Sequence, residues 1–290
     1  MIAFLHRENI PAASDMMVGL PGQTFETCKT DLQFFFDHKV IATIFATSVM
    51  PNAPMADPAY QERFQIVVDD EGMVESTYSF TREEYQRMFS LCLAYKLFVK
   101  LGLLKYVLYY VQIEHGLPAM DFVARWLEKC DSEPDRYPLS SRIKREMIGG
   151  GYRGGKKDWL ILGWKDDQAA FLFDDPSAFH REILSFLEAE HGVSLTGPVA
   201  EAVLAANGEV MPRKGRQLPA EVPLTHDVPG YFSDLRVIPS LSDIPPDHVP
   251  LGARPPGALK IKDAPSCTSY GFIDFGLTRG ELELASNLQI

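Results

Sequence analysis

The chain contains 290 residues, of which 46% are hydrophobic and 23% are charged, so its length predicts one to three globular domains rather than a fibrous or disordered chain. Its 28 lysine and arginine residues against 39 aspartate and glutamate residues give a formal net charge of −11, which disfavours a general nucleic-acid-binding protein. Its four cysteines lie far apart, which excludes a disulfide-rich scaffold and indicates free thiols.

Two features argue against an exported or membrane-bound chain. The N-terminal residues lack the long apolar core and the small-residue cleavage site of a signal peptide. The most apolar stretch, residues 89–113, contains Lys96, Lys100 and Lys105, and a lysine at the centre of a membrane span costs about 2.5–3.5 kcal/mol. We therefore expect a buried helix in this stretch and a cytoplasmic protein without membrane contact.

The first segment has the pattern of a strand, a turn and a helix, followed by a second strand. Residues 15–19 (DMMVG) form a short apolar run, LPGQ at 20–23 marks a turn, and Thr24 can cap a helix. Residues 40–49 (VIATIFATSV) are apolar without alternation, as in a parallel strand that is buried on both faces. This order predicts a parallel βαβ unit. The helix residues at core-facing spacing are Cys28, Leu32, Phe35 and Phe36.

The middle of the chain is predicted to be helical. We expect irregular chain over residues 57–80, with an edge strand near 64–68. The capping-box pattern Thr81-x-x-Glu84 then opens a long helix that reaches about residue 104, with a break near its end. Further helices are predicted over residues 105–114, 119–130, 177–191 and 198–206.

A basic, glycine-rich stretch at residues 140–157 holds six lysine and arginine residues and one glutamate. It has the spacing of a phosphate-binding loop, but Lys157 replaces the serine or threonine that would hold Mg²⁺, and the stretch precedes a predicted strand instead of following one. We therefore reject nucleotide hydrolysis, and two interpretations remain, a basic hinge or a contact for an anionic substrate or partner domain.

The last third of the chain is predicted to hold little regular structure after its helices. A hairpin is expected over residues 158–173, and a short strand over 270–277. Eleven of the 21 prolines fall between residues 212 and 265, which argues for extended, poorly packed chain.

Three segments resemble, in their order and spacing, the C-terminal half of a radical S-adenosylmethionine (SAM) core. They are residues 15–38 (DMMVGLPGQTFETCKTDLQFFFDH), 44–64 (IFATSVMPNAPMADPAYQERF) and 78–88 (YSFTREEYQRM). The chain is most similar to the subgroup that carries an N-terminal cobalamin-binding domain. The resemblance covers residues 1 to about 90 and is looser to about 130.

The resemblance implies an α/β fold, a partial TIM-like barrel that contributes its last parallel strands, with a helical region and a small α+β C-terminal module. The domains expected on this basis are the C-terminal part of the barrel at residues 1–60, the helical region at 61–145, the α+β module at 158–210 and a proline-rich extended tail at 211–290.

The resemblance also implies an activity. In the family, a [4Fe-4S] cluster held by a CxxxCxxC loop reductively cleaves SAM to a 5′-deoxyadenosyl radical, which abstracts hydrogen from a small-molecule substrate. Methyl transfer assisted by cobalamin, or oxidative cyclisation, would be consistent with the subgroup. The matching positions imply that Asp15 contacts the ribose or amino-acid portion of SAM, that Gly19 and Gly22 shape the pocket, and that the backbone of Ser48 lies near the adenine.

The cysteines depart from the family pattern. No CxxxCxxC sequence occurs among Cys28, Cys92, Cys130 and Cys267, and the closest pair is 38 residues apart. A cluster needs thiolates that converge on it. We therefore expect a chain that begins in mid-barrel and cannot bind the iron–sulfur cluster by itself. Three hypotheses remain: a part of a longer enzyme, one half of a split enzyme completed by a second chain, or a non-catalytic binding module.

Overall fold

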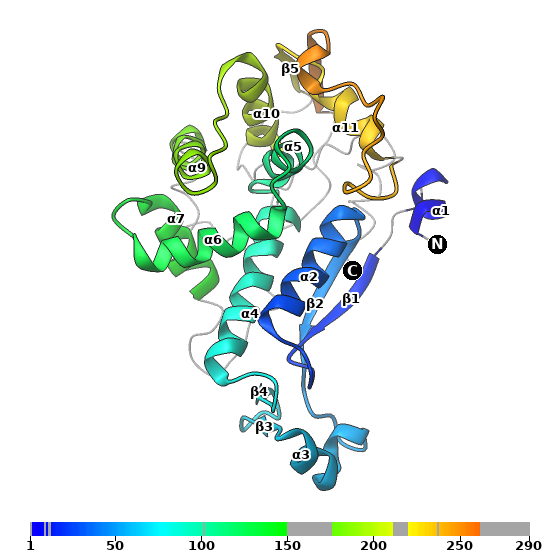
Figure 1. The fold of residues 1–290 in the computed structure, drawn as a ribbon, viewed down its shortest axis with the longest axis vertical. Coiled ribbons are helices and arrows are strands. Elements are labelled where there is room, and N and C mark those ends of the chain that lie inside the picture. The colour runs from blue at the N-terminus through cyan, green and yellow to red at the C-terminus, as the bar shows by residue number, and fades with distance from the viewer. Residues whose placement is uncertain are drawn as a thin grey trace.

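The first regular unit of the chain is the predicted βαβ unit, built from β1 (Ala13–Val18), α2 (Phe25–Asp37) and β2 (Ile41–Ala46). The computed structural model describes residues 2–8, 10, 13–100, 102–149, 176–210, 220–236 and 238–261. The architecture is α/β, mostly helical with small sheets, and a short helix α1 (Ile2–Arg7) precedes β1. In Figure 1, α2 lies over the β1–β2 pair, and α4 runs alongside α2.

The prediction that Thr24 caps the N-terminus of α2 is confirmed. The hydroxyl of Thr24 accepts a hydrogen bond from the N–H of Thr27 at 3.2 Å, and the hydroxyl of Thr27 accepts one from the N–H of Thr24 at 2.8 Å. These two bonds satisfy N–H groups that a helix start otherwise leaves without partners. Of the predicted core-facing residues, Cys28, Leu32 and Phe36 are fully buried, and Phe35 is partly buried.

Strands β1 and β2 pair in parallel, with Asp15 opposite Thr43 and Met17 opposite Phe45. Side chains alternate along a strand, so Met16 and Val18 are buried under α2 while Asp15 and Met17 are exposed. The prediction that the second strand is buried on both faces is wrong, because Thr43 and Phe45 lie on the same face as Asp15 and are only half-buried. This face of the pair is called the open face below.

Residues 54–76 are more regular than expected. They form a 3-10 turn η1 (Pro54–Ala56), helix α3 (Pro58–Phe64) and the short antiparallel pair β3 (Val67–Val68) and β4 (Val74–Ser76). The predicted edge strand near 64–68 is therefore shorter than expected. Its first residue, Phe64, ends α3, a helix that starts where the carboxylate of Asp57 accepts from the N–H of Ala59 at 2.8 Å. These elements project at one end of the molecule (Figure 1).

The predicted capping box at Thr81 and Glu84 is confirmed at the start of α4 (Arg82–Tyr95). The helix then widens into a π-helical turn η2 (Lys96–Lys100), and Gly102 adopts a left-handed φ of 77°. The predicted long helix thus changes form after Tyr95 and stops at the glycine, which is the residue type that tolerates positive φ.

The helices predicted further along the chain are also confirmed, and they pack on α4 and on one another around a common apolar core. Their large buried side chains include Phe122, Trp126 and Phe186, and Trp126 packs against Phe98 of η2. The helical elements of this part are α5 (Lys105–His115), α6 (Ala119–Ser132), α7 (Pro138–Ile143), the π-helical turn η3 (Lys144–Ile148), α9 (Pro176–His191) and α10 (Gly197–Val210).

The expectation of extended, poorly packed chain after residue 211 is wrong for the part that the structure describes. This part holds β5 (Ala220–Leu224), α11 (Val228–Arg236), η5 (Leu251–Ala253) and β6 (Gly257–Ile261). Strands β5 and β6 pair antiparallel, and α11 buries Tyr231 and Phe232 in the core. Prolines are tolerated here because both strands of a two-stranded sheet are edge strands, and because a helix accepts proline in its first turn.

The predicted hairpin at 158–173, the strand at 270–277 and the glycine-rich part of the basic stretch at 150–157 lie outside the described residues. None of the described helices is long and apolar enough to cross a membrane.

Candidate functional site

The glycines of the GLPGQT sequence form a tight turn between the carboxyl end of β1 and the start of α2. Gly19 and Gly22 both adopt positive φ, at 98° and 94°, which residues with a side chain rarely do. The turn is closed by a hydrogen bond from the N–H of Gln23 to the carbonyl oxygen of Leu20 at 3.0 Å. The predicted strand–turn–helix geometry is therefore present.

Gly19 is buried against the side chain of Tyr85, which α4 supplies. A Cβ atom at position 19 would lie 2.8 Å from Cε2 of Tyr85 and 3.7 Å from Cβ of Thr47. The first distance is shorter than a carbon–carbon contact allows, so only glycine lets the tyrosine ring pack on the turn. The glycine thus serves the packing of α4 against the end of β1.

Gly22 lies against the loop that precedes α4. Its N–H donates to the hydroxyl oxygen of Ser79 at 2.9 Å, and a Cβ atom at position 22 would lie 3.3 Å from the hydroxyl oxygen of Tyr78. Both glycines are therefore held by protein contacts that fix the shape of the turn.

Ser48 lies just beyond the end of β2, in a bridge to Met73. The two hydrogen bonds of this bridge run from Val49 N–H to the carbonyl oxygen of Gly72 at 2.8 Å and from Val74 N–H to the carbonyl oxygen of Thr47 at 3.0 Å. They involve the neighbours of Ser48, so the N–H and carbonyl groups of Ser48 itself point away from β4, as in any non-hydrogen-bonded antiparallel pair.

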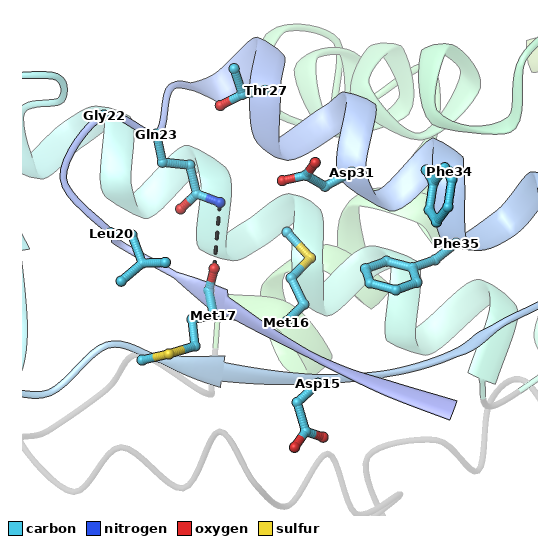
Figure 2. A pocket seen from close by; sticks show the side chains of 10 residues that line it. All are labelled: Asp15, Met16, Met17, Leu20, Gly22, Gln23, Thr27, Asp31, Phe34 and Phe35. Atoms are coloured by element: carbon cyan, nitrogen blue, oxygen red, sulfur yellow. Dashed lines mark hydrogen bonds between the residues drawn. The ribbon is translucent and has the colours of Figure 1, made fainter. Parts of the chain in front are cut away.

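Asp15 lies apart from the other three predicted residues. It is exposed in the middle of β1, and Figure 2 shows its carboxylate on the side of the strand opposite to Met16 and Asp31. Three residues of strand separate it from Gly19, and the four steps along the strand span about 13 Å. Gly19 is next to Thr47 and hence to the end of β2, so the structure brings the turn and Ser48 together and places Asp15 further along the open face.

Gln23 is a residue that the sequence analysis did not select. Its Oε1 accepts from the N–H of Gly19 at 2.8 Å, and its Nε2 donates to the carbonyl oxygen of Met17 at 3.4 Å (Figure 2). The side chain therefore reaches back across its own turn to the last peptide groups of β1. The only signal for Gln23 in the sequence is its position in the GLPGQT motif.

A shallow groove of about 440 Å³ runs along β1 and is lined both by Asp15 and Met17 of the open face and by residues of α2. Three large apolar side chains on its walls are unusually exposed, Met17 at 43%, Leu20 at 38% and Phe34 at 46%. Apolar side chains that are exposed together mark a surface suited to binding another molecule. The groove is lined by Asp15, Met16, Met17, Leu20, Gly22, Gln23, Thr27, Asp31, Phe34 and Phe35 (Figure 2).

Asp31 is the carboxylate on the α2 side of the groove. Partial burial raises its pKa above the ordinary aspartate value. Its carboxylate gives the α2 side of the groove an acidic group beside the apolar rings.

The three cysteines that the structure describes do not fit an iron–sulfur cluster. The Sγ atoms of Cys28 and Cys92 lie 3.7 Å apart in the core between α2 and α4, and both residues are buried. The contact with Cys28, and then burial, raise the pKa of Cys92, while burial raises the pKa of Cys130 to about 12. Cluster ligands are thiolates, and the raised pKa values of Cys92 and Cys130 oppose ionisation of these two thiols. Among the residues that the structure describes, no group of three metal-binding side chains converges.

A scan against models of known protein families found no match for this chain, and a search of the curated proteins found none either.

Proposed function

We propose that the chain is the C-terminal portion of a radical SAM enzyme, in which β1 and β2 are the last parallel strands of a partial TIM-like barrel. The observation that carries the proposal is the parallel pair itself, with a two-glycine turn at its carboxyl end and one face on which Asp15 and Met17 are exposed. In barrels of this kind helices cover the outer face, as α2 does here, and ligands bind at the carboxyl ends of the strands.

The open face offers polar groups suited to SAM. Asp15 is exposed there beside Thr43 on β2, and a carboxylate accepts hydrogen bonds from ribose hydroxyls or from an ammonium group. The backbone groups of Ser48 that point away from β4 are available for the edge of an adenine ring. In this proposal Gly19 and Gly22 act indirectly, since they shape the turn at the carboxyl end of β1, which lies beside Ser48.

The cluster would come from elsewhere. The described thiols are buried and do not converge with other metal-binding side chains of the described residues, and the sequence contains no CxxxCxxC, so we assign the ligands of the [4Fe-4S] cluster to another polypeptide segment. Cobalamin, if the enzyme uses it, would likewise bind outside these residues. Hydrogen abstraction from a small-molecule substrate is the reaction class that follows from the proposal, and the residues described here would position SAM for it.

Isothermal titration calorimetry of the purified chain with SAM tests the proposal without the cluster. We expect binding that weakens about tenfold or more in Asp15→Asn, because a hydrogen bond to a charged group contributes about 1.5–3 kcal/mol. Asp70→Asn is the matched control, since Asp70 is exposed in the turn between β3 and β4, away from the open face. Equal affinity of the wild type and Asp15→Asn, or no binding at all, would contradict the proposed site.

A further inference from the structure

We propose that residues 238–254 form an acid-released strap, which protonation of His248 undocks from α5 and α11. The strap joins α11 to β6, so both of its ends are anchored in regular structure. Its opening is a local rearrangement and not a loss of the fold. It requires neither SAM nor an iron–sulfur cluster and is therefore independent of the proposed function.

The first part of the strap packs on the loop between α2 and β2. The N–H of Leu241 donates to the carbonyl oxygen of Asp37 at 2.9 Å. The ammonium group of Lys39 donates to the carbonyl oxygen of Ile238 at 2.5 Å. The side chains of Ile238 and Leu241 are buried. An open strap would therefore uncover apolar side chains and the loop that leads into β2.

The last part of the strap is tied to α5 by one carboxylate. Oε1 of Glu114 accepts from the hydroxyl of Tyr231 on α11 at 2.8 Å and from the N–H of Leu251 at 3.1 Å. Tyr231 and Leu251 are fully buried. Burial and the neighbouring carboxylate of Glu114 raise the pKa of Tyr231, so its hydroxyl remains the donor in this contact. One side chain thus holds α5, α11 and the strap together.

His248 lies three residues before Leu251 and packs on the same tyrosine. The ring centroids of His248 and Tyr231 are 5.2 Å apart, and the guanidinium carbon of Arg254 lies 5.3 Å from the centroid of the tyrosine ring. Nε2 of His248 is buried and has no hydrogen-bond partner among the described residues. A neutral imidazole can leave a lone pair at this nitrogen, whereas an imidazolium carries N–H groups on both nitrogens. Protonation would therefore bury a donor without an acceptor.

The charged groups around His248 act in both directions. Burial and the guanidinium of Arg254 oppose its protonation, whereas the carboxylates favour it. These carboxylates are Glu114 on α5, Asp234 on α11 and Asp247 on the strap itself. Arg254 is paired with Asp234 at 2.6 Å, so their effects on the ring largely offset each other. Burial is the largest effect, and it places the pKa of His248 in the docked strap below the ordinary value of 6.5.

Protonation loosens the strap by either of two routes. A buried imidazolium without an acceptor favours the open strap, in which water solvates it. If Glu114 instead turned to accept from Nε2, it would give up the hydrogen bonds from Tyr231 and Leu251. In the open strap His248 has its ordinary pKa of 6.5, so the open form binds the proton more readily than the docked form. Docking is therefore strongest above 6.5 and weakens as the pH falls from there toward the lower pKa of the docked state.

Hydrogen exchange of the full ¹⁵N-labelled chain tests the strap at about pH 7.5 and about pH 5.5, which bracket the ordinary pKa of histidine. The protection factors of the N–H groups of Leu241 and Leu251, corrected for the pH dependence of the exchange chemistry, should be about three- to tenfold lower at the acid pH. This range follows from a histidine pKa of about 6.5 in the open strap and a lower one in the docked strap.

An amide inside α5 distinguishes a local opening from unfolding. The N–H of Leu108 donates to the carbonyl oxygen of Leu104 at 2.9 Å, and its protection should change less than that of Leu241 and Leu251. Strap amides that keep their protection at the acid pH would overturn the proposal. Equal losses at all three positions would overturn it as well, because they mean that the whole fold opens.

Substitution of His248 tests the trigger. His248→Phe keeps an aromatic ring on Tyr231 but cannot be protonated, so its strap amides should have the same protection at both pH values. His191→Phe is the matched control. His191 also has a buried Nε2 without a partner among the described residues and a pKa that burial lowers, but it lies at the end of α9. This control should lose protection at Leu251 as the wild type does. A strap that still opens on acidification in folded His248→Phe would show the proposal to be wrong.

The titration of His248 itself is a second measurement, and the wild type alone suffices for it. The Cε1–H signal of His248 should titrate below 6.5. Glu114→Gln keeps an acceptor oxygen for Tyr231 and Leu251 but removes a charge that favours the imidazolium, so the midpoint should move to still lower pH. A wild-type midpoint at or above 6.5 would contradict the proposal, and an unchanged midpoint in Glu114→Gln would contradict the role of Glu114.

Discussion

The ring of Tyr85 lies so close to Gly19 that a Cβ atom there would be 2.8 Å from its Cε2 atom. This contact joins the turn after β1 to α4, and it explains the first glycine of the GLPG sequence by packing rather than by direct ligand contact. The SAM-facing groups of the proposed site are consequently backbone groups near Ser48 and the carboxylate of Asp15.

Gly19→Ala should therefore destabilise the fold. The substituted residue would have to keep a φ of 98° and displace Tyr85, at a combined cost of about 2–5 kcal/mol in the free energy of unfolding. Gly116→Ala is the control, because Gly116 also has positive φ but no atom within 4 Å of the added Cβ, so about 1–2 kcal/mol is expected. Urea denaturation measures both, and equal losses would refute the packing role.

Asn207 on α10 should be essential for the start of α5. It is fully buried, its Oδ1 accepts from the N–H of Tyr106 at 3.1 Å, and its Nδ2 donates to the carbonyl oxygen of Leu103 at 2.9 Å. Asn207→Ala would leave two buried backbone groups unpaired and should cost about 2–5 kcal/mol. Glu201→Ala, at an exposed position of the same helix, should change the free energy of unfolding by about 0.5 kcal/mol or less.

Glu190 should make the stability depend on pH in the acid range. Burial by itself would raise its pKa, but hydrogen bonds from Arg125, Lys129 and Tyr137 outweigh this and hold the pKa below the ordinary value of 4.5. The unfolded chain then binds the proton more readily than the folded chain. The stabilisation from Glu190 is therefore complete above 4.5 and is lost as the pH falls through the lower pKa of the folded state.

Urea denaturation at a series of pH values checks this expectation. Glu190→Gln should be less stable than the wild type at neutral pH, and its free energy of unfolding should fall less steeply on acidification. A slope that matches the wild type would show that Glu190 contributes nothing to the pH dependence. Glu188→Gln, at an exposed position on the same helix, is the matched control.

The thiols of Cys28, Cys92 and Cys130 should resist both alkylation and cluster assembly. All three are buried, and the raised pKa values of Cys92 and Cys130 leave almost no thiolate at neutral pH. Iodoacetamide should modify them only after denaturation, as mass spectrometry of peptides would show. Anaerobic incubation of this chain with ferrous iron and sulfide should likewise yield no [4Fe-4S] absorption. A cluster formed by the 290 residues, with SAM bound to it, would contradict the account.

Much of the fold follows from local sequence. The βαβ unit and the caps at Thr24 and Thr81 were predictable, because strands, turns and capping boxes are set by residues a few positions apart. The packed chain around α11 could not be predicted in this way. Its many prolines favoured extended chain, and the burial of Tyr231 depends on elements that are distant in the sequence.

The candidate site was predictable in position but only partly in detail. Its turn could be found from the GLPG sequence, whereas the separation of Asp15 from Gly19 and the contact with Tyr85 depend on how strand and helices pack. Gln23 acts through a side chain that folds back on its own strand, which no residue spacing reveals.

Nuclear magnetic resonance of methionine methyl groups during a titration with SAM tests the central claim most directly. Met17 is exposed on the open face with Asp15, Met16 faces α2, and Met120 of α6 is buried in the core. We predict that SAM shifts the methyl signal of Met17, leaves that of Met120 unchanged and has a weaker effect in Asp15→Asn. A Met17 signal that does not move at saturating SAM would contradict a SAM site on this face.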